Sequence, residues 1–218
     1  MMSNSGLYLL ASIALAMVVP TTLQGQTLQT AIPRQAQQAA AESLETLRAL
    51  AAPAENFAKL GLKESREAER ARLGDPMPDY VIDLTALRAW NGDNPKSLLR
   101  STGQFIYPIT VDGATRTSVT IARVNGEWTA ASFGPPDEAQ ARSQIQNDLK
   151  AKSGQVIQVR VPALNAVFVA RQTDDTLEFT PVVSQPRFDL TAGRAEPAKQ
   201  VLLRMQPAAK TLDTSVPH

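Results

Sequence analysis

The alternation of apolar and polar residues in the middle of the chain predicts a β-sheet. Three strand-like runs, Phe105–Val111, Ala114–Val124 and Glu127–Phe133, are joined by the dipeptides Asp112-Gly113 and Asn125-Gly126. Both dipeptides favour the positive φ angles of a two-residue hairpin turn. We therefore expect a three-stranded antiparallel meander, and two-residue turns would place Arg123 directly opposite Trp128.

Helical spacing of apolar residues precedes the meander and recurs after it. Residues 35–52 are rich in Ala and Gln, carry Leu44, Leu47 and Leu50 at helical spacing and end at Pro53. Residues 54–73 continue with opposite charges three apart, as on a solvated helix face. Residues 136–151 have acidic residues in the first turn and an inner stripe at Ile145 and Leu149. All three regions are predicted to be helical.

Shorter segments complete the predicted elements and define the fold class. The expected strands are Tyr80–Leu84, Gln155–Val161, Ala166–Ala170 and Leu177–Val183, and the expected helices are Thr85–Trp90 and Glu196–Met205. Pro181 would move its strand toward a sheet edge. Because the strands follow one another in hairpins, we expect an α+β fold, with an antiparallel sheet, helices packed on one face and further helices preceding it. A doubly wound parallel sheet is the less favoured alternative.

The N-terminal segment has the pattern of a secretory signal peptide. An uncharged apolar run, Leu7–Val19, is followed by Pro20 and two threonines. This run is shorter than the roughly 20 residues that cross a bilayer. We expect residues 1–25 to be cleaved after Gly25 and the mature chain to be exported, periplasmic or extracellular, without a stable membrane span. The alternative is an uncleaved anchor or a buried apolar helix.

The mature chain is long enough for one core. We expect an Ala/Gln-rich and charged helical segment over residues 26–73, an α+β domain over 74–206 and a disordered tail over 207–218. The heptapeptide Asp83–Ala89 recurs as Asp189–Ala195 with one difference, Leu87 against Gly193. Reuse of a strand-exit and helix-cap sequence, or chance, explains this echo better than a duplicated half-domain.

Residue usage narrows the possible chemistry. The chain has no cysteine, and its one histidine is the final residue, His218. It therefore lacks disulfides, a lipobox cysteine, and the imidazole or thiol groups of common nucleophile systems and zinc sites. Lys and Arg total 22 against 21 for Asp and Glu. This balance, without a basic cluster, argues against a nucleic-acid partner.

The remaining polar residues form no recognisable catalytic or metal-binding motif. Asp75, Asp79 and Asp83 are four apart, but the intervening prolines break any helix that would align them. The acidic residues at 174–178 are interpreted as a solvated turn, since they lack the oxygen-rich loop of a calcium site. We therefore predict no catalytic residue, no cofactor and no metal.

Arg123 and Trp128 are the candidate binding residues. Opposed across the hairpin, they could form a cation-π pair and an exposed recognition patch. The alternative is that Trp128 packs on the sheet against a helix, as large aromatic residues usually do. Trp90 and Tyr107 leave the same two interpretations open.

A resemblance to known proteins covers roughly residues 73–134. The residues that carry it are Leu73-Gly74-Asp75-Pro76, Tyr80-Val81-Ile82, Tyr107-Pro108, Asp112-Gly113, and Gly126-Glu127-Trp128 through Phe133-Gly134. This pattern resembles uncharacterised exported bacterial proteins. The order of helices followed by a meander is also similar to cystatin-like and PepSY-like modules, which bind peptides or inhibit proteases, although no inhibitory wedge motif is recognisable here.

Three functions follow as hypotheses. The favoured one is an exported, non-catalytic module that binds a protein or peptide partner through sheet surface or edge in the bacterial envelope or outside the cell. The second is a structural or assembly factor of the envelope that acts through its N-terminal helices. The third is a hydrolase with two convergent carboxylates, which would lie about 5 to 10 Å apart in a cleft.

Overall fold

The computed structural model describes residues 31–212, and it has an α+β fold. The predicted signal segment, its cleavage point and the last six residues of the predicted tail lie outside this range. The α-helices are α1 (Arg34–Ala51), α2 (Leu84–Ala89), α3 (Pro136–Lys150) and α4 (Ala198–Thr211). Short 3-10 turns are η1 (Ala58–Leu60), η2 (Ser65–Arg70), η3 (Pro95–Leu98), η4 (Pro162–Leu164) and η5 (Pro186–Phe188).

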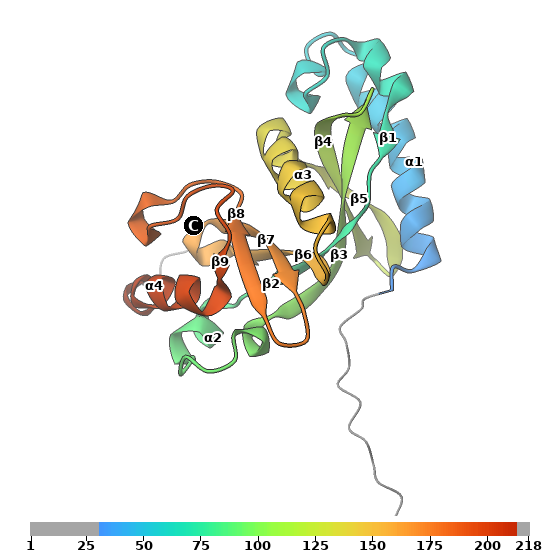
Figure 1. Cartoon of the computed structure of the whole chain (residues 1–218). Coiled ribbons are helices and arrows are strands. Elements are labelled where there is room, and N and C mark those ends of the chain that lie inside the picture. Colours follow the sequence, from blue (N-terminus) through green and yellow to red (C-terminus); the bar gives the residue numbers. More distant parts are fainter. Residues whose placement is uncertain (1–30, 213–218) are drawn as a thin grey trace, which may run out of the picture.

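The strands of the described chain form one sheet in the order β5-β4-β3-β2-β6-β7-β8-β9, while β1 pairs with the far end of β3 (Figure 1). Their bounds are β1 (Arg72–Leu73), β2 (Met77–Val81), β3 (Arg100–Val111), β4 (Ala114–Val124), β5 (Glu127–Phe133), β6 (Gln155–Val161), β7 (Ala166–Gln172), β8 (Leu177–Pro181) and β9 (Glu196–Pro197). Two three-stranded meanders, β3-β4-β5 and β6-β7-β8, thus flank the central strand β2.

Both turns of the first meander adopt the predicted backbone. Asp112 and Gly113 have φ angles of 51° and 81°, and Asn125 and Gly126 have φ angles of 53° and 89°. Consecutive positive φ angles match the right-handed twist of the flanking strands. The resulting register places Arg123 opposite Trp128, which confirms the predicted pairing.

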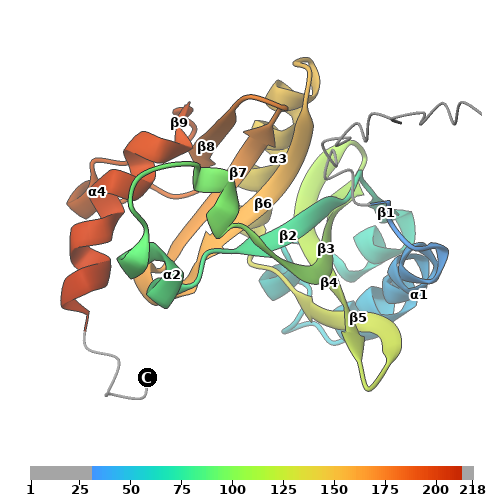
Figure 2. The ribbon, with the colours of Figure 1, turned by 90° about the horizontal axis from the view of Figure 1, so that it is seen from below.

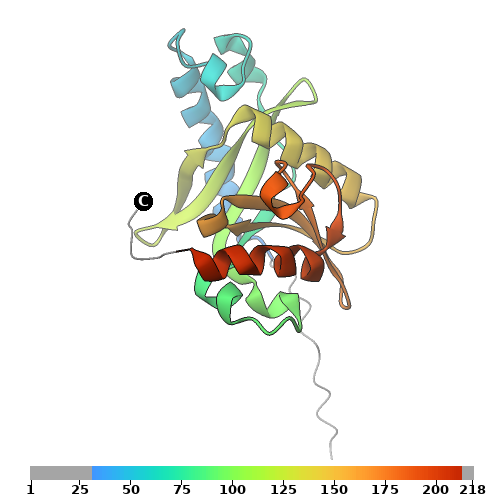
Figure 3. The same ribbon diagram turned by 90° about the vertical axis from the view of Figure 1, so that its left-hand side faces the viewer.

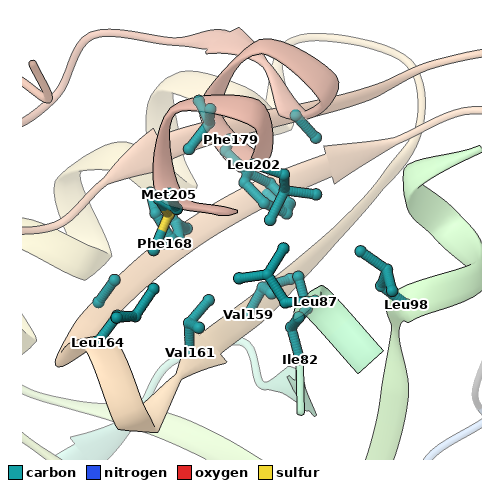
Figure 4. Close-up of a cluster of buried hydrophobic side chains, with 14 of the residues drawn as sticks. Ile82, Leu87, Leu98, Val159, Val161, Leu164, Phe168, Phe179, Leu202 and Met205 are labelled. Carbon is teal, nitrogen blue, oxygen red and sulfur yellow. The ribbon is translucent and has the colours of Figure 1, made fainter. Parts of the chain in front are cut away.

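Helices cover both faces of the sheet. On β7, Phe168 and Ala170 belong to a core with α2 and α4 (Figure 4), whereas the intervening Val169 packs with Ile145 and Leu149 of α3. Adjacent residues of a strand point to opposite faces, so α3 and α4 lie on opposite sides of the sheet. The second meander therefore lies between two helical layers.

The first meander is covered in the same way. Val119 of β4 packs in a core with α1, while the preceding Ser118 accepts a hydrogen bond of 3.3 Å from Arg142 of α3. Figure 2 shows α1 and α4 at opposite ends of the molecule, and Figure 3 shows α3 extending along the sheet between them. The long helices are therefore arranged as α1 and α4 on one face and α3 on the other.

Two details of the predicted sheet are wrong. The sheet is antiparallel except at its centre, where β2 and β6 are parallel, and the helices are not confined to one face. Both differences have one cause. The chain leaves the edge strand β5 and re-enters the middle of the sheet at β6, so the connecting helix α3 has to cross a face of the sheet. A crossover of this kind leaves no local signal in the strand pattern.

The N-terminal segment packs against the sheet, because the buried residues of α1 share a core with β3 and β4. Helix α1 forms as predicted, but its buried face consists mainly of small residues, Ala36, Ala39, Ala40, Ser43, Leu47 and Ala51, whereas Leu50 is 41% exposed. Alanines let the helix approach the sheet closely. Residues 54–73 are 3-10 turns and the short β1 rather than the predicted helix, because Glu67 turns inward to accept the Lys63 N–H at 2.6 Å and to pair with Arg116.

The C-terminal predictions need two corrections. Helix α4 continues to Thr211 and includes Pro207, so the predicted disordered tail begins too early. Its end is held by Arg88 of α2, whose guanidinium donates to the carbonyl oxygens of Ala209 and Leu212. The two copies of the echoed heptapeptide also differ in structure.

Asp83, which begins the first copy of this heptapeptide, caps α2 by accepting the Thr85 N–H at 2.8 Å. In the second copy, Asp189 and Gly193 have φ angles of 53° and 75°, and the segment forms turns before β9. A left-handed Gly193 ends local helical structure, so no helix forms within the second copy, and α4 begins after it, at Ala198.

Candidate functional site

The side chain of Trp128 lies between the protein core and a surface depression. On its inner side the indole is 5.7 Å from the ring of Phe105, at an interplanar angle of 39°. The guanidinium carbon of Arg123 lies 5.7 Å from the indole centroid. Trp128 is half-buried. Core packing and the cation-π pair, which the sequence offered as alternatives, therefore coexist on one side chain.

The depression beside Trp128 lies between helix α1 and the start of strand β5. It has a volume of about 290 Å³ and is lined by Gln35, Gln38, Ala39, Glu42, Gly126, Glu127 and Trp128. We refer to it as the α1/β5 groove. Helix α1 supplies one wall through its polar residues, and the β4–β5 turn supplies the other. Of the two predicted binding residues, Trp128 forms part of the wall and Arg123 lies beside the indole without lining the groove.

Sequence reasoning missed the α1 wall of this groove. The helix itself is predictable, but its contact with β5 joins residues about 90 positions apart. The sequence feature that could have indicated this wall is the order of small and polar residues along α1. Ala39 is 6% exposed, whereas Gln38 and Glu42 on either side of it are exposed. This alternation shows that α1 has a polar margin beside its buried face, but it does not indicate which strand lies next to that margin.

Strand β5 forms an open edge of the sheet. Within residues 31–212 it pairs only with β4. Its sequence contains no Pro, Lys or Arg, the residues that commonly protect an edge from another strand. The opposite edge is β9, which has only two residues, one of them Pro197. Proline has no N–H to donate to a new strand. The two edges of the sheet are therefore unequal.

The register of β5 identifies which main-chain groups face outward. Val124 and Glu127 flank a two-residue turn and form a hydrogen-bonded pair, so the alternate residues Trp128 and Ala130 direct their N–H and C=O groups to the free edge. A bulge follows, because Ala130 pairs with Ile121 and Ser132 with Thr120, which leaves Ala131 unpaired. The regular part of the open edge is therefore short and lies along the α1/β5 groove.

A second polar cluster lies inside the molecule, beneath α3. Asp79 of β2 is fully buried, and its carboxylate accepts hydrogen bonds from Arg160 at 3.0 and 2.5 Å, from Gln158 at 2.7 Å and from Thr102 at 3.0 Å. The hydrogen bond to Asp79 raises the pKa of Arg160, whereas burial lowers the pKa of Arg142 nearby. This network joins β2, β3 and β6, and all four contacts hold one carboxylate in place.

The other candidate residues have structural roles. Trp90 and Tyr107 are 8% and 5% exposed and pack in the two main cores. Glu178, in the acidic tip, pairs with Arg171 at 2.7 Å. The buried Glu67 pairs with Arg116 at 3.0 Å. Within the described range, no group of three or more His, Cys, Asp or Glu residues is arranged to hold a metal ion.

Comparisons with models of known protein families, with curated proteins and with solved structures give no match. None of the helices between residues 31 and 212 combines the length and the apolar character needed to cross a membrane. The site is therefore interpreted from the geometry of this chain alone.

Proposed function

We propose that this chain is an exported recognition module that binds an extended segment of a protein or peptide partner by adding a strand to β5. The observation that carries the proposal is the open β5 edge beside the α1/β5 groove. Trp128 and Ala130 offer two N–H and two C=O groups to an incoming strand, and main-chain hydrogen bonds of this kind give affinity in strand addition.

The groove would supply specificity. Side chains of an added strand alternate between its two faces, so every second side chain would point toward α1 and enter the α1/β5 groove. There it would meet the indole of Trp128 and the polar side chains of α1. Tryptophan is common among the residues that dominate binding energy at interfaces, because it offers a large apolar surface with one polar atom.

The other two functions have less support. An assembly factor that acts through α1 would need a free apolar helix face, but the buried residues of α1 already pack against β3 and β4. A hydrolase would need two convergent carboxylates. The two buried carboxylates of the described chain, Glu67 and Asp79, are each engaged by an arginine from a different strand.

Export rests on the apolar run at residues 7–19 and the Pro20 that follows it. A mature chain without cysteine depends on its apolar core rather than on disulfides, so it can fold in an oxidising or a reducing compartment. The partner would then be an envelope or extracellular protein.

Two variants test strand addition. Ala130→Pro removes an N–H that faces the open edge and leaves the β4–β5 hydrogen bonds in place, as tolerated for proline on edge strands. Gln38→Trp fills the groove from an exposed position of α1. Thr46→Trp is the matched control, since Thr46 is exposed on α1 and does not line the groove. Circular dichroism and a denaturant titration establish that each variant folds.

The assay uses immobilised mature protein, residues 26–218, to select from a phage-displayed library of random linear peptides. We expect enriched peptides that bind the unmodified protein and Thr46→Trp but lose binding to both Ala130→Pro and Gln38→Trp. If no peptide is enriched, or if the enriched peptides bind folded Ala130→Pro and Gln38→Trp as well as the unmodified protein, the proposal is wrong.

A further inference from the structure

The bulge in β5 limits the part of the open edge that a regular strand can pair with. On β4, Ile121 pairs with Ala130, whereas its neighbour Thr120 pairs with Ser132, so Ala131 is an extra residue on β5. An extra residue of this kind shifts the alternation of main-chain groups by one position and increases the local twist of the strand. The free groups before and after Ala131 therefore do not form one regular series.

After the bulge, the outward-facing groups are out of phase with those before it. Ser132 faces β4, because its partner Thr120 lies four residues from Val124, the β4 residue of the hydrogen-bonded pair beside the turn. Phe133 is therefore the next outward-facing residue, three positions after Ala130. A regular strand offers main-chain groups to one edge at every second residue. A guest strand in register with Ala130 is thus out of register with Phe133.

The usable part of the edge consequently spans residues 128–130. The turn at Asn125-Gly126 bounds it at one end, and the bulge at Ala131 bounds it at the other. Strands of globular proteins usually have about five or six residues. This edge is shorter, so it matches a short extended segment better than a full strand of another sheet.

The two possible directions of a guest strand require different lengths. In an antiparallel pair, the guest residue opposite Trp128 exchanges two hydrogen bonds with it, and the guest residue opposite Ala130 does the same. Three consecutive guest residues then make all four bonds. In a parallel pair, each outward residue bonds to the guest residues before and after the one opposite it, so the same four bonds need five guest residues. The last of the five would lie beside the bulge at Ala131, where the strand bends.

We infer that the β5 edge binds a short segment of its partner that runs antiparallel to β5 and pairs through three residues, opposite residues 128–130. This inference rests on the proposed function, because it specifies the length and direction of the same ligand. Opposed residues of a pair share a face of the sheet. The last of the three guest residues lies opposite Trp128, so its side chain is the one that points toward the α1/β5 groove, while the middle side chain points to the other face.

The length is tested by N-methylation of a peptide that the mature protein enriches, one residue at a time, with binding followed by fluorescence polarisation. N-methylation of the first or third paired residue removes the N–H that donates to Ala130 or Trp128, and each should weaken binding about tenfold. N-methylation of the middle residue, whose N–H points away, should change the affinity by less than about threefold. Removal of peptide residues outside these three should also have effects below about threefold.

The direction is tested by a nitroxide label at one end of the peptide and NMR spectra of the mature protein. The chain has no cysteine, so a thiol-reactive label attaches only to a cysteine added to the peptide. A label at the C-terminus should broaden the amide signals of Gly126 and Glu127 more than those of Ser132 and Phe133, and a label at the N-terminus should do the reverse. The same complexes with the nitroxide reduced are the control.

Two results would overturn the inference, namely the opposite broadening pattern, which shows a parallel guest, and any number of sensitive N-methyl positions other than two. Strand addition itself still stands in these cases when N-methyl groups and Ala130→Pro weaken binding. If the peptide binds without any sensitive position, or if no peptide is enriched, the proposed function is removed as well.

Discussion

At the scale of single residues, Tyr107 shows that burial does not always mean a favourable contact. Its side chain lies in the core beneath α1 and is 5% exposed, yet its hydroxyl has no hydrogen-bond partner among the described residues. Burial raises the pKa of the Tyr107 phenol, because the charged form is the more costly one to remove from water. The aromatic ring therefore stabilises the core while its oxygen opposes it.

Replacement Tyr107→Phe should consequently not destabilise the protein and should raise its free energy of unfolding by about 1 kcal/mol at pH 7. Because the folded-state pKa of Tyr107 is raised, its ionisation leaves the free energy of unfolding unchanged below pH about 10. The free energy of unfolding then falls as the pH rises toward the folded-state pKa. The advantage of Tyr107→Phe should therefore grow between pH 8 and pH 10.5. Urea titrations of the unmodified protein and of Tyr107→Phe at pH 7, pH 8 and pH 10.5 measure this difference in the free energy of unfolding. A loss of more than about 1 kcal/mol in Tyr107→Phe at pH 7 would indicate that the hydroxyl has a partner.

At the scale of elements, two glycines in turns have left-handed backbone conformations that a side chain would disfavour. Gly61 ends η1 in a left-handed conformation with φ of 72°, and a Cβ atom there would lie 2.3 Å from the carbonyl oxygen of Arg116. Gly113, in the β3–β4 turn, has φ of 81° but no heavy atom within 4 Å of the same added atom. A non-glycine residue would therefore be strained in its backbone at both positions, but only at Gly61 would its Cβ atom also clash with a neighbouring strand.

Alanine at these two glycines separates the two effects. Gly113→Ala should cost about 1 kcal/mol, the strain of a left-handed non-glycine residue. Gly61→Ala should cost about 3 kcal/mol, because the connection must also move away from β4. Chemical denaturation of both variants gives the comparison. Equal losses would show that the backbone around Gly61 adapts without cost.

The sequence predicted correctly those elements whose conformation depends on residues close together in the chain. The dipeptides Asp112-Gly113 and Asn125-Gly126 determine their turns through their own φ angles, so the meander, its register and the opposition of Arg123 and Trp128 were all predicted. Residues 54–73 were not predicted correctly, because the inward turn of Glu67 depends on Arg116, almost 50 positions away. Trp128 was identified, but the α1 wall opposite it depends on packing that no local pattern encodes.

At the scale of the whole molecule, the two meanders meet at one parallel strand pair, β2 with β6. The buried Asp79 of β2 and its partners Arg160 and Gln158 of β6 lie in this junction, and α3 packs against both β4 and β7. A shared sheet and a shared covering helix should make the halves unfold together. Trp90 lies in the core of one half, and Trp128 borders the core of the other.

Asp79→Ala should lower the free energy of unfolding by about 2 to 3 kcal/mol, because it leaves the buried Gln158 and the partly exposed Arg160 without their partner. The control Lys150→Ala, which breaks the exposed pair with Asp75, should cost less than about 1 kcal/mol. In single-tryptophan backgrounds, Trp90→Phe and Trp128→Phe, the remaining indole reports on one half. The two reporters should agree on one unfolding midpoint in the unmodified protein, and they should agree again on a lower midpoint in Asp79→Ala. A shift confined to one reporter would mean that the halves unfold separately.

The short β9 strand also limits how the molecule can associate. Because the two-residue β9 contains Pro197, pairing with another strand is disfavoured at this edge, and a strand that joins β5 would extend the sheet from the opposite edge. In the proposed complex, each molecule would then offer one sheet edge, that of β5, to a guest strand. We therefore expect the proposed complex to contain one copy of each component.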